Sequence, residues 1–165
     1  MYVPRMEDWS NYAVITGGGA AALVGLLFVA VSIRTDLISQ SKALRARVGQ
    51  ILTILMGLLC TSIMVGLPNP YPWVLGIELV ASAFGLATAL ILLNRRAKRE
   101  TTVDQLERII DRVNPNVTTV VLIGLSGVGL LFGIEASLFI LFVGALVGLV
   151  GCVIGAWLVL IRPVT

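Results

Sequence analysis

Long runs without a charged residue constrain this chain more than any other feature of its sequence. A helix needs about 20 residues, at about 1.5 Å each, to cross a hydrocarbon core about 30 Å thick. Five uncharged runs can be read directly, and they are Ser10–Ile33, Val48–Ile77, Leu79–Asn94, Val113–Ile134 and Ala136–Ile161. Hydrophobic residues make up 58% and charged residues 13% of the chain, whereas soluble domains average roughly 45–50% and 25%. These features predict an integral membrane protein rather than buried helices of a soluble protein.

Prolines and one charged residue divide the runs into five predicted transmembrane helices. Pro68, Pro70 and Pro72 end the second run, because proline lacks an N–H and its ring clashes with the preceding helical turn. Glu135 alone separates the last two runs, which are together too long for one crossing, and Ser137 is a candidate N-cap for the last span. The predicted spans are residues 12–33, 48–67, 73–93, 117–134 and 138–161. The fold class is therefore all-α, as one polytopic transmembrane domain.

The distribution of basic residues predicts the orientation of these spans. Lys and Arg concentrate in cytoplasmic loops, and Trp and Tyr prefer the level of the lipid headgroups. Three segments lie on one side of a five-span protein (34–47, 94–116 and 162–165), and they hold every Lys and Arg except Arg5. The aromatic residues at the opposite boundary are Tyr2, Trp9, Tyr12, Tyr71 and Trp73. We predict that the N-terminus lies outside and the C-terminus in the cytoplasm.

The longest cytoplasmic segment is predicted to hold a short amphipathic helix over residues 102–113. Its start, Thr102-Val-Asp-Gln105, matches a capping box. The apolar residues that follow at helical spacing are Val103, Leu106, Ile109, Ile110 and Val113. The basic cluster that precedes it is predicted to contact lipid headgroups, and it consists of Arg95, Arg96, Lys98 and Arg99. Nucleic-acid binding is not predicted, because the cluster is short and pressed against the membrane.

Glycine is placed within the spans instead of in the loops. All 17 glycines lie inside the predicted spans or at their ends, whereas soluble proteins collect glycine in turns. Small residues let membrane helices approach closely, and the predicted helix-packing residues are Gly18, Ala22, Gly25, Gly49, Gly57, Gly85, Gly144 and Gly148. The tract 17–19 lacks the lysine and the strand of a phosphate loop, and it predicts close helix packing. Small faces on all spans indicate a homo-oligomer, and a compact monomer that uses both faces internally is the alternative.

Glu78 is the acidic residue that lies within a predicted span. A carboxylate inside a membrane is costly and marks a candidate functional site. Glu78 shares a helix face with Ser82, and Glu135 lies at the same outer level, so these three residues form a candidate outer vestibule. Repeated around an axis, such acidic residues would attract cations. The alternative is that Glu78 pairs with Arg5 or accepts backbone hydrogen bonds.

No set of residues for catalysis, metal binding or cofactor binding emerges. The chain has no histidine, and Cys60 and Cys152 do not form a CxxC pair. Ser126, between glycines, lacks the strand–turn–helix context of a nucleophile elbow. We therefore predict no enzyme and no cofactor. The first hypothesis is a homo-oligomeric, cation-preferring channel, and the alternative is a non-conducting scaffold or regulatory subunit of another membrane complex. The predicted partners are membrane lipid, further copies of the chain and another membrane protein.

The first span resembles the opening of a known group of proteins. The residues that carry the resemblance are Trp9, Gly18–Ala22, Gly25 and Phe28-Val-Ala-Val-Ser32. A tryptophan before a Gly/Ala-rich first span that ends in FVAVS is similar to a family of small bacterial membrane proteins of unsettled function, sometimes labelled modulators of the membrane protease FtsH. The resemblance covers about a fifth of the chain, and it implies the inner membrane of a bacterium.

Overall fold

The computed structural model describes residues 9–33, 35, 42–67, 71–98 and 115–161, and every regular element among them is a helix. Its elements are α1 (Ser10–Ile33), α3 (Lys42–Gly66), α4 (Pro72–Lys98), α6 (Pro115–Leu131), the short 3-10 helix η3 (Glu135–Ser137) and α7 (Leu138–Ile161). The prediction of an all-α fold is confirmed for this part of the chain. The amphipathic helix predicted over residues 102–113 lies outside the described residues.

Four of the helices are long and apolar enough to cross a membrane. They are α1, α3 from Leu44, α4 as far as Arg95, and α7 as far as Leu158. The fifth, α6, is apolar but has 17 residues, which corresponds to about 25 Å of helix. That length is slightly less than the about 30 Å of a hydrocarbon core. The prediction of a multi-pass membrane protein is thus confirmed at this level, with four long spans and one shorter apolar helix.

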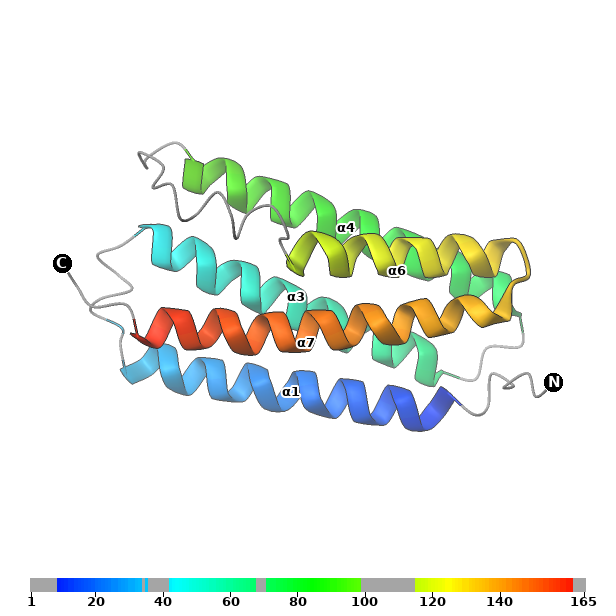
Figure 1. The fold of residues 1–165 in the computed structure, drawn as a ribbon, viewed down its shortest axis with the longest axis horizontal. Helices are drawn as coiled ribbons and strands as arrows, with labels where there is room; N and C mark the ends of the chain where they lie inside the picture. The colour runs from blue at the N-terminus through cyan, green and yellow to red at the C-terminus, as the bar shows by residue number, and fades with distance from the viewer. Residues whose placement is uncertain (1–8, 34, 36–41, 68–70, 99–114, 162–165) are drawn as a thin grey trace.

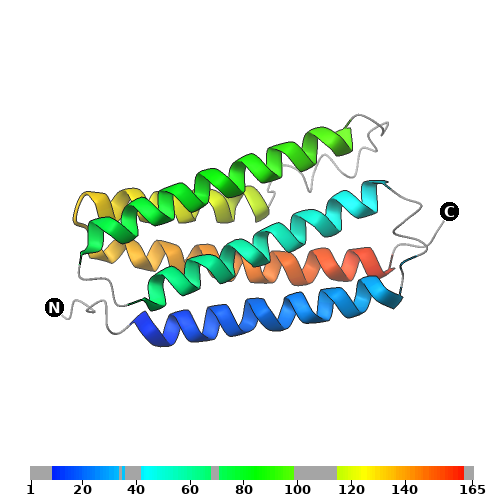
Figure 2. The same cartoon turned by 180° about the vertical axis from the view of Figure 1, so that it is seen from behind.

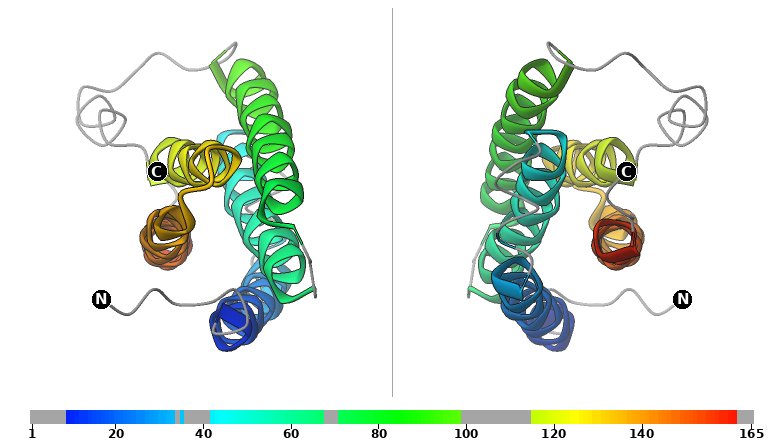
Figure 3. Two further views of the ribbon diagram at one scale, coloured as in Figure 1. Left: turned by 90° about the vertical axis from the view of Figure 1, so that its right-hand side faces the viewer. Right: turned by 90° about the vertical axis from the view of Figure 1, so that its left-hand side faces the viewer.

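The helices run in alternating directions, so that their ends gather into two groups (Figures 1 and 2). One group contains the start of α1, the start of α4 and the turn between α6 and α7, and we call it the Trp9 end. The other contains the start of α3 and the ends of α4 and α7, and we call it the Arg95 end. Viewed along the bundle, α1, α3 and α4 form a row, and α6 and α7 lie on one side of it (Figure 3). In this arrangement α7 packs against α6, α3 and α1.

Helices α4 and α6 approach each other through a pair of glycines. A Cβ atom added to Gly76 would lie 2.9 Å from the carbonyl oxygen of Gly127, and one added to Gly127 would lie 2.9 Å from the carbonyl oxygen of Gly76. Both positions are buried. Such distances leave no room for a side chain, so the two backbones are in direct contact. This is the close approach that small residues permit between helices in a membrane.

The three consecutive glycines of α1 face three different directions, because successive residues of a helix are turned by about 100°. A Cβ at Gly17 would lie 3.2 Å from Ser62 Cβ in α3, and one at Gly19 would lie 4.0 Å from Leu149 Cδ1 in α7. A Cβ at Gly18 would meet no atom of the described residues within 4 Å. Helix α1 continues through the tract without a break. Gly17 therefore lets α1 fit closely against α3, Gly19 faces α7 at a distance that would admit a Cβ, and Gly18 faces outward.

Aromatic rings join the start of α1 to the start of α7. The Trp9 ring lies 5.3 Å from the Phe139 ring and 5.6 Å from the Tyr12 ring, both in edge-to-face geometry. Trp9 is only 8% exposed. It lies at the predicted end of the bundle, but its ring packs against protein instead of facing the headgroups. Tyr71 and Trp73, at the same end, are exposed as the prediction requires of residues at the membrane boundary.

Candidate functional site

The turn between α6 and α7 is built by a glycine in the left-handed region. Gly133 has φ of +75°, a conformation that costs a residue with a Cβ about 1–2 kcal/mol. The N–H of Ile134 donates to the carbonyl of Gly129, and the N–H of Gly133 donates to the carbonyl of Leu130, both at 3.0 Å. This pair of bonds is a Schellman motif, which satisfies the last carbonyls of a helix. It ends α6 at Leu131, three residues before the approximate end predicted for the fourth span.

Ser137 lies immediately before α7, where a residue that caps the helix is expected. Its side chain is 3% exposed, and its Oγ has no hydrogen-bond partner among the described residues. The predicted capping bond is therefore not formed. The backbone of Ser137 is used instead, since its carbonyl accepts a 2.8 Å hydrogen bond from Ser126 Oγ in α6. A Cβ at Gly129 would lie 2.4 Å from Ser137 Cβ, so Gly129 makes room for this serine.

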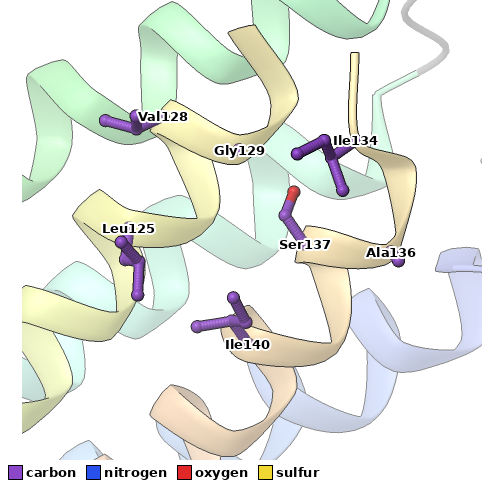
Figure 4. A pocket seen from close by; sticks show the side chains of 7 residues that line it. All are labelled: Leu125, Val128, Gly129, Ile134, Ala136, Ser137 and Ile140. Carbon is purple, nitrogen blue, oxygen red and sulfur yellow. The ribbon is translucent and has the colours of Figure 1, made fainter. Parts of the chain in front are cut away.

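A pocket of about 390 Å³ lies beside this turn, between the last turns of α6 and the first turn of α7. Figure 4 shows the side chains that line it, which are Leu125, Val128, Gly129, Ile134, Ala136, Ser137 and Ile140. Leu125, Val128 and Ile134 are exposed, so the pocket opens on the surface of the bundle. Every lining side chain except that of Ser137 is apolar. The pocket is thus suited to a hydrocarbon ligand and carries one hydroxyl group.

Glu78 and Glu135 lie toward the Trp9 end, and Ser82 lies one turn further along α4; no described hydrogen bond joins the three residues. Glu78 is partly buried in the second turn of α4, and its Oε2 is buried without a hydrogen-bond partner among the described residues. Ser82 Oγ donates instead to the carbonyl of Leu79, at 2.8 Å. Glu135 begins η3 at the same end of the bundle (Figure 1), and its side chain is not described. The pocket described above includes none of the three residues.

No described basic side chain lies near Glu78. Helix α4 packs against α3 and α6, and α6 contains no charged residue. Arg45 lies in the first turn of α3, and Arg95 follows Glu78 by about 26 Å of helical rise, so both belong to the Arg95 end. Arg5, the alternative partner, lies outside the described residues. The buried Oε2 of Glu78 is therefore an acceptor with no described counter-charge.

The other polar groups of the described core are mostly satisfied within their own helices. Ser62 Oγ and Thr61 Oγ1 donate to the carbonyl of Leu58, and Thr119 Oγ1 donates to that of Pro115. One bond that crosses between helices joins Gln50 Nε2 to Asn94 Oδ1 at 2.5 Å. The buried core of the described bundle consists mostly of apolar side chains.

The predicted helix-packing residues divide into two groups. Gly49, Gly57, Gly144 and Gly148 face neighbouring helices, with atoms of Leu93, Leu86, Leu122 and Thr119, respectively, within 3.5 Å of an added Cβ. Gly18, Gly25 and Gly85 meet no described atom within 4 Å, and Ala22 is exposed. Within the described bundle, this second group does not take part in packing.

The structure also shows features of this turn that the sequence reasoning missed, namely the roles of Gly129 and Gly133 and the pocket at Ser137. The signal was Gly133, which lies two residues after the end of α6, where glycine is typical of a helix C-terminus. Cys60 is exposed and Cys152 is buried. Of the basic cluster, Arg95 is exposed at the end of α4, Arg96 and Lys98 lie in the last turn with undescribed side chains, and Arg99 lies outside the described residues.

The resemblance of the first span to small bacterial membrane proteins stays a prediction. No protein-family model matches the chain, and no match to it is found among curated proteins or among solved structures.

Proposed function

We propose that the protein is a non-conducting scaffold of the bacterial inner membrane, which associates laterally through the outward face of α1. The observation that carries the proposal is a stripe of small residues that no other described residue covers. Gly18 and Gly25 meet no described atom within 4 Å, and Ala21 and Ala22 between them are exposed. Their spacing of three, four and seven residues places all four on one side of the helix. We call these four residues the α1 glycine face.

The opposite side of α1 already makes the contacts that the bundle needs. Ala13, Thr16, Ala20 and Leu27 are buried against the other helices. Lipid chains give no advantage to small residues over leucine, whereas a second helix gains van der Waals contact when small residues let it approach. An identical face on a second copy fits best, because a twofold-symmetric interface pairs a surface with itself. The α1 glycine face therefore supports pairing of α1 with α1.

The proposal includes a topology of five crossings, with α6 as the fourth. Residues before α1 would lie outside the cell and those after α7 in the cytoplasm. This orientation is supported by Arg45, Arg47 and Arg95, which all belong to the Arg95 end of the bundle. The basic cluster would then lie at cytoplasmic headgroups, as the excess of basic residues on that side favours.

Replacing both Gly18 and Gly25 with leucine is expected to weaken self-association by at least about tenfold, because the bulky side chains separate the paired helices. The measurement is the monomer–dimer equilibrium of labelled protein in lipid bilayers, followed by single-molecule photobleaching. Gly85→Leu is the matched control, since it places the same side chain at an open glycine of α4. It should leave the equilibrium unchanged. A double variant that associates like the wild type would rule out the α1 glycine face.

A cation channel is the second candidate, and the buried Oε2 of Glu78, which has no described partner, favours it. Because the described interior is apolar, a conducting path would have to form between copies. As a scaffold, the wild-type protein is expected to carry no current above that of empty bilayers, and Glu78→Gln should behave identically. Planar-bilayer recordings in potassium and sodium salts test this. A cation current in the wild type that Glu78→Gln lowers would replace the scaffold by the channel.

A further inference from the structure

The start of α7 combines three features that point to a ligand. It is the N-terminus of a 24-residue helix, and the first N–H groups of such a helix have no acceptor within the helix. Ser137, the residue placed to cap it, is 3% exposed and its Oγ has no described partner. The pocket of about 390 Å³ lies directly beside it. Buried hydroxyl groups are as a rule hydrogen-bonded, so an unpartnered one next to an open pocket requires an explanation.

The one polar side chain that lines the pocket, that of Ser137, belongs to the turn. Ser137, Gly129 and Ala136 lie beside the turn, and Leu125 and Ile140 lie further along the helices, away from the turn (Figure 4). The turn belongs to the Trp9 end, where the exposed Tyr71 and Trp73 indicate the headgroup level. A ligand in the pocket would therefore have its polar group near the headgroups and its apolar part directed toward the middle of the membrane.

The absence of charged residues in the pocket lining indicates which kind of amphiphilic ligand it can bind. None of its seven lining residues is charged, and an anion placed there without a cation would carry a large desolvation cost. A phosphate group or a fatty-acid carboxylate is therefore disfavoured. A neutral ester carbonyl is suited to the pocket, because it accepts one hydrogen bond and a hydroxyl supplies one.

We propose that this pocket binds one ester-linked acyl chain of a diacyl phospholipid. The chain lies along Leu125, Val128 and Ile140, and its ester carbonyl oxygen accepts a hydrogen bond from Ser137 Oγ. In this structure the hydroxyl packs toward Gly129, where an added Cβ would lie 2.9 Å from Oγ. Rotation about the Cα–Cβ bond, between staggered positions, turns it toward the ligand. Binding thus satisfies a hydroxyl that the described residues leave without a partner, and it is independent of the proposed scaffold function.

The test uses the full-length protein in vesicles of phosphatidylethanolamine and phosphatidylglycerol. A trace of phosphatidylglycerol carries a photoreactive diazirine in one acyl chain, joined in one preparation by an ester and in another by an ether, which lacks the carbonyl. After irradiation, mass spectrometry locates the labelled residues. We expect label on the segment 125–140, with an ester-to-ether ratio of about five, as one neutral hydrogen bond implies. Equal labelling by the two lipids in the wild-type protein would overturn the proposal.

Three variants separate the pocket from the hydroxyl. Ser137→Ala keeps the Cβ that packs against Gly129, and it should lower the ester label to the ether level. Val128→Trp fills the pocket and should remove both labels from this segment. Val121→Trp introduces the same side chain at an exposed position of α6 outside the pocket, and it should keep both. Unchanged labelling in Val128→Trp, or competition by free fatty acid as strong as by phospholipid, would overturn the proposal.

Discussion

Replacing Gly127 with alanine is expected to separate α4 from α6 and to lower the free energy of unfolding by about 2 kcal/mol. The added Cβ would lie 2.9 Å from the Gly76 carbonyl oxygen and 2.9 Å from Leu79 Cβ. These atoms belong to the backbone or are fixed to it, so neither can rotate away. One of the helices must therefore shift, and contacts along their whole interface weaken. Reversible unfolding in mixed micelles of increasing sodium dodecyl sulfate measures the change.

Two further glycine variants serve as controls for that experiment. Gly57→Ala places a Cβ 2.5 Å from Leu86 Cδ2, but this methyl group is the end of a flexible side chain, so the loss should be smaller. The Cβ added by Gly85→Ala would meet no described atom within 4 Å. This variant should leave the free energy of unfolding unchanged or raise it by up to about 1 kcal/mol, because alanine is the better helix former. Equal unfolding free energies for Gly127→Ala and Gly85→Ala would contradict the direct contact of α4 and α6.

Replacing Gly129 with alanine is expected to open the turn between α6 and α7, with a loss of about 2–3 kcal/mol. Its Cβ would lie 2.4 Å from Ser137 Cβ and 2.9 Å from Ser137 Oγ. The serine cannot withdraw, because its carbonyl is bound to Ser126 and its N–H to Ile134. The same unfolding measurement applies, and limited proteolysis at the turn reports the local opening.

A second substitution tests whether this loss comes from the contact with Ser137. Adding Ser137→Gly removes the opposing Cβ, so the double variant should regain most of the stability that Gly129→Ala loses. Adding Ser137→Ala keeps that Cβ and should regain little. Such a coupling between neighbouring sites is what a double-mutant cycle detects. If the losses in unfolding free energy from Gly129→Ala and Ser137→Gly simply added in the double variant, the two residues would not be in contact.

The helices could be predicted from the sequence to a large extent, because their apolar runs match the length that a membrane requires. The predicted helix boundaries differ from the observed ones where backbone geometry, and not hydropathy, determines where a helix begins or ends. Helix α4 continues to Lys98, since a helix extends beyond the apolar part that a span prediction detects. Pro72 begins α4, as suits a residue whose missing N–H is not needed in the first turn. Gly133 ends α6 early by its positive φ.

The candidate site was much less predictable, because spacing shows which residues share a face but not what that face meets. Gly18 and Gly57 belong to similar patterns, yet only Gly57 has a neighbouring helix in the described bundle. The acidity of Glu78 was evident in the sequence, whereas its lack of a described partner depends on the packing of α3, α4 and α6. The pocket at Ser137 lies beside a turn whose geometry depends on one glycine in the left-handed region, Gly133. A hydropathy pattern contains no signal for such a turn.

The three directions of Gly17, Gly18 and Gly19 also limit how α1 can change during evolution. An insertion or deletion of one residue before this tract would rotate the rest of the helix by about 100°. The glycine that fits against Ser62 would then be replaced there by a different residue, and the contact with α7 would change as well. Insertions of seven residues, close to two full turns, would restore the orientation. The length of the segment between Trp9 and Gly17 should therefore vary in steps of whole turns among homologous chains, whereas substitutions at outward positions such as Val14 remain freer.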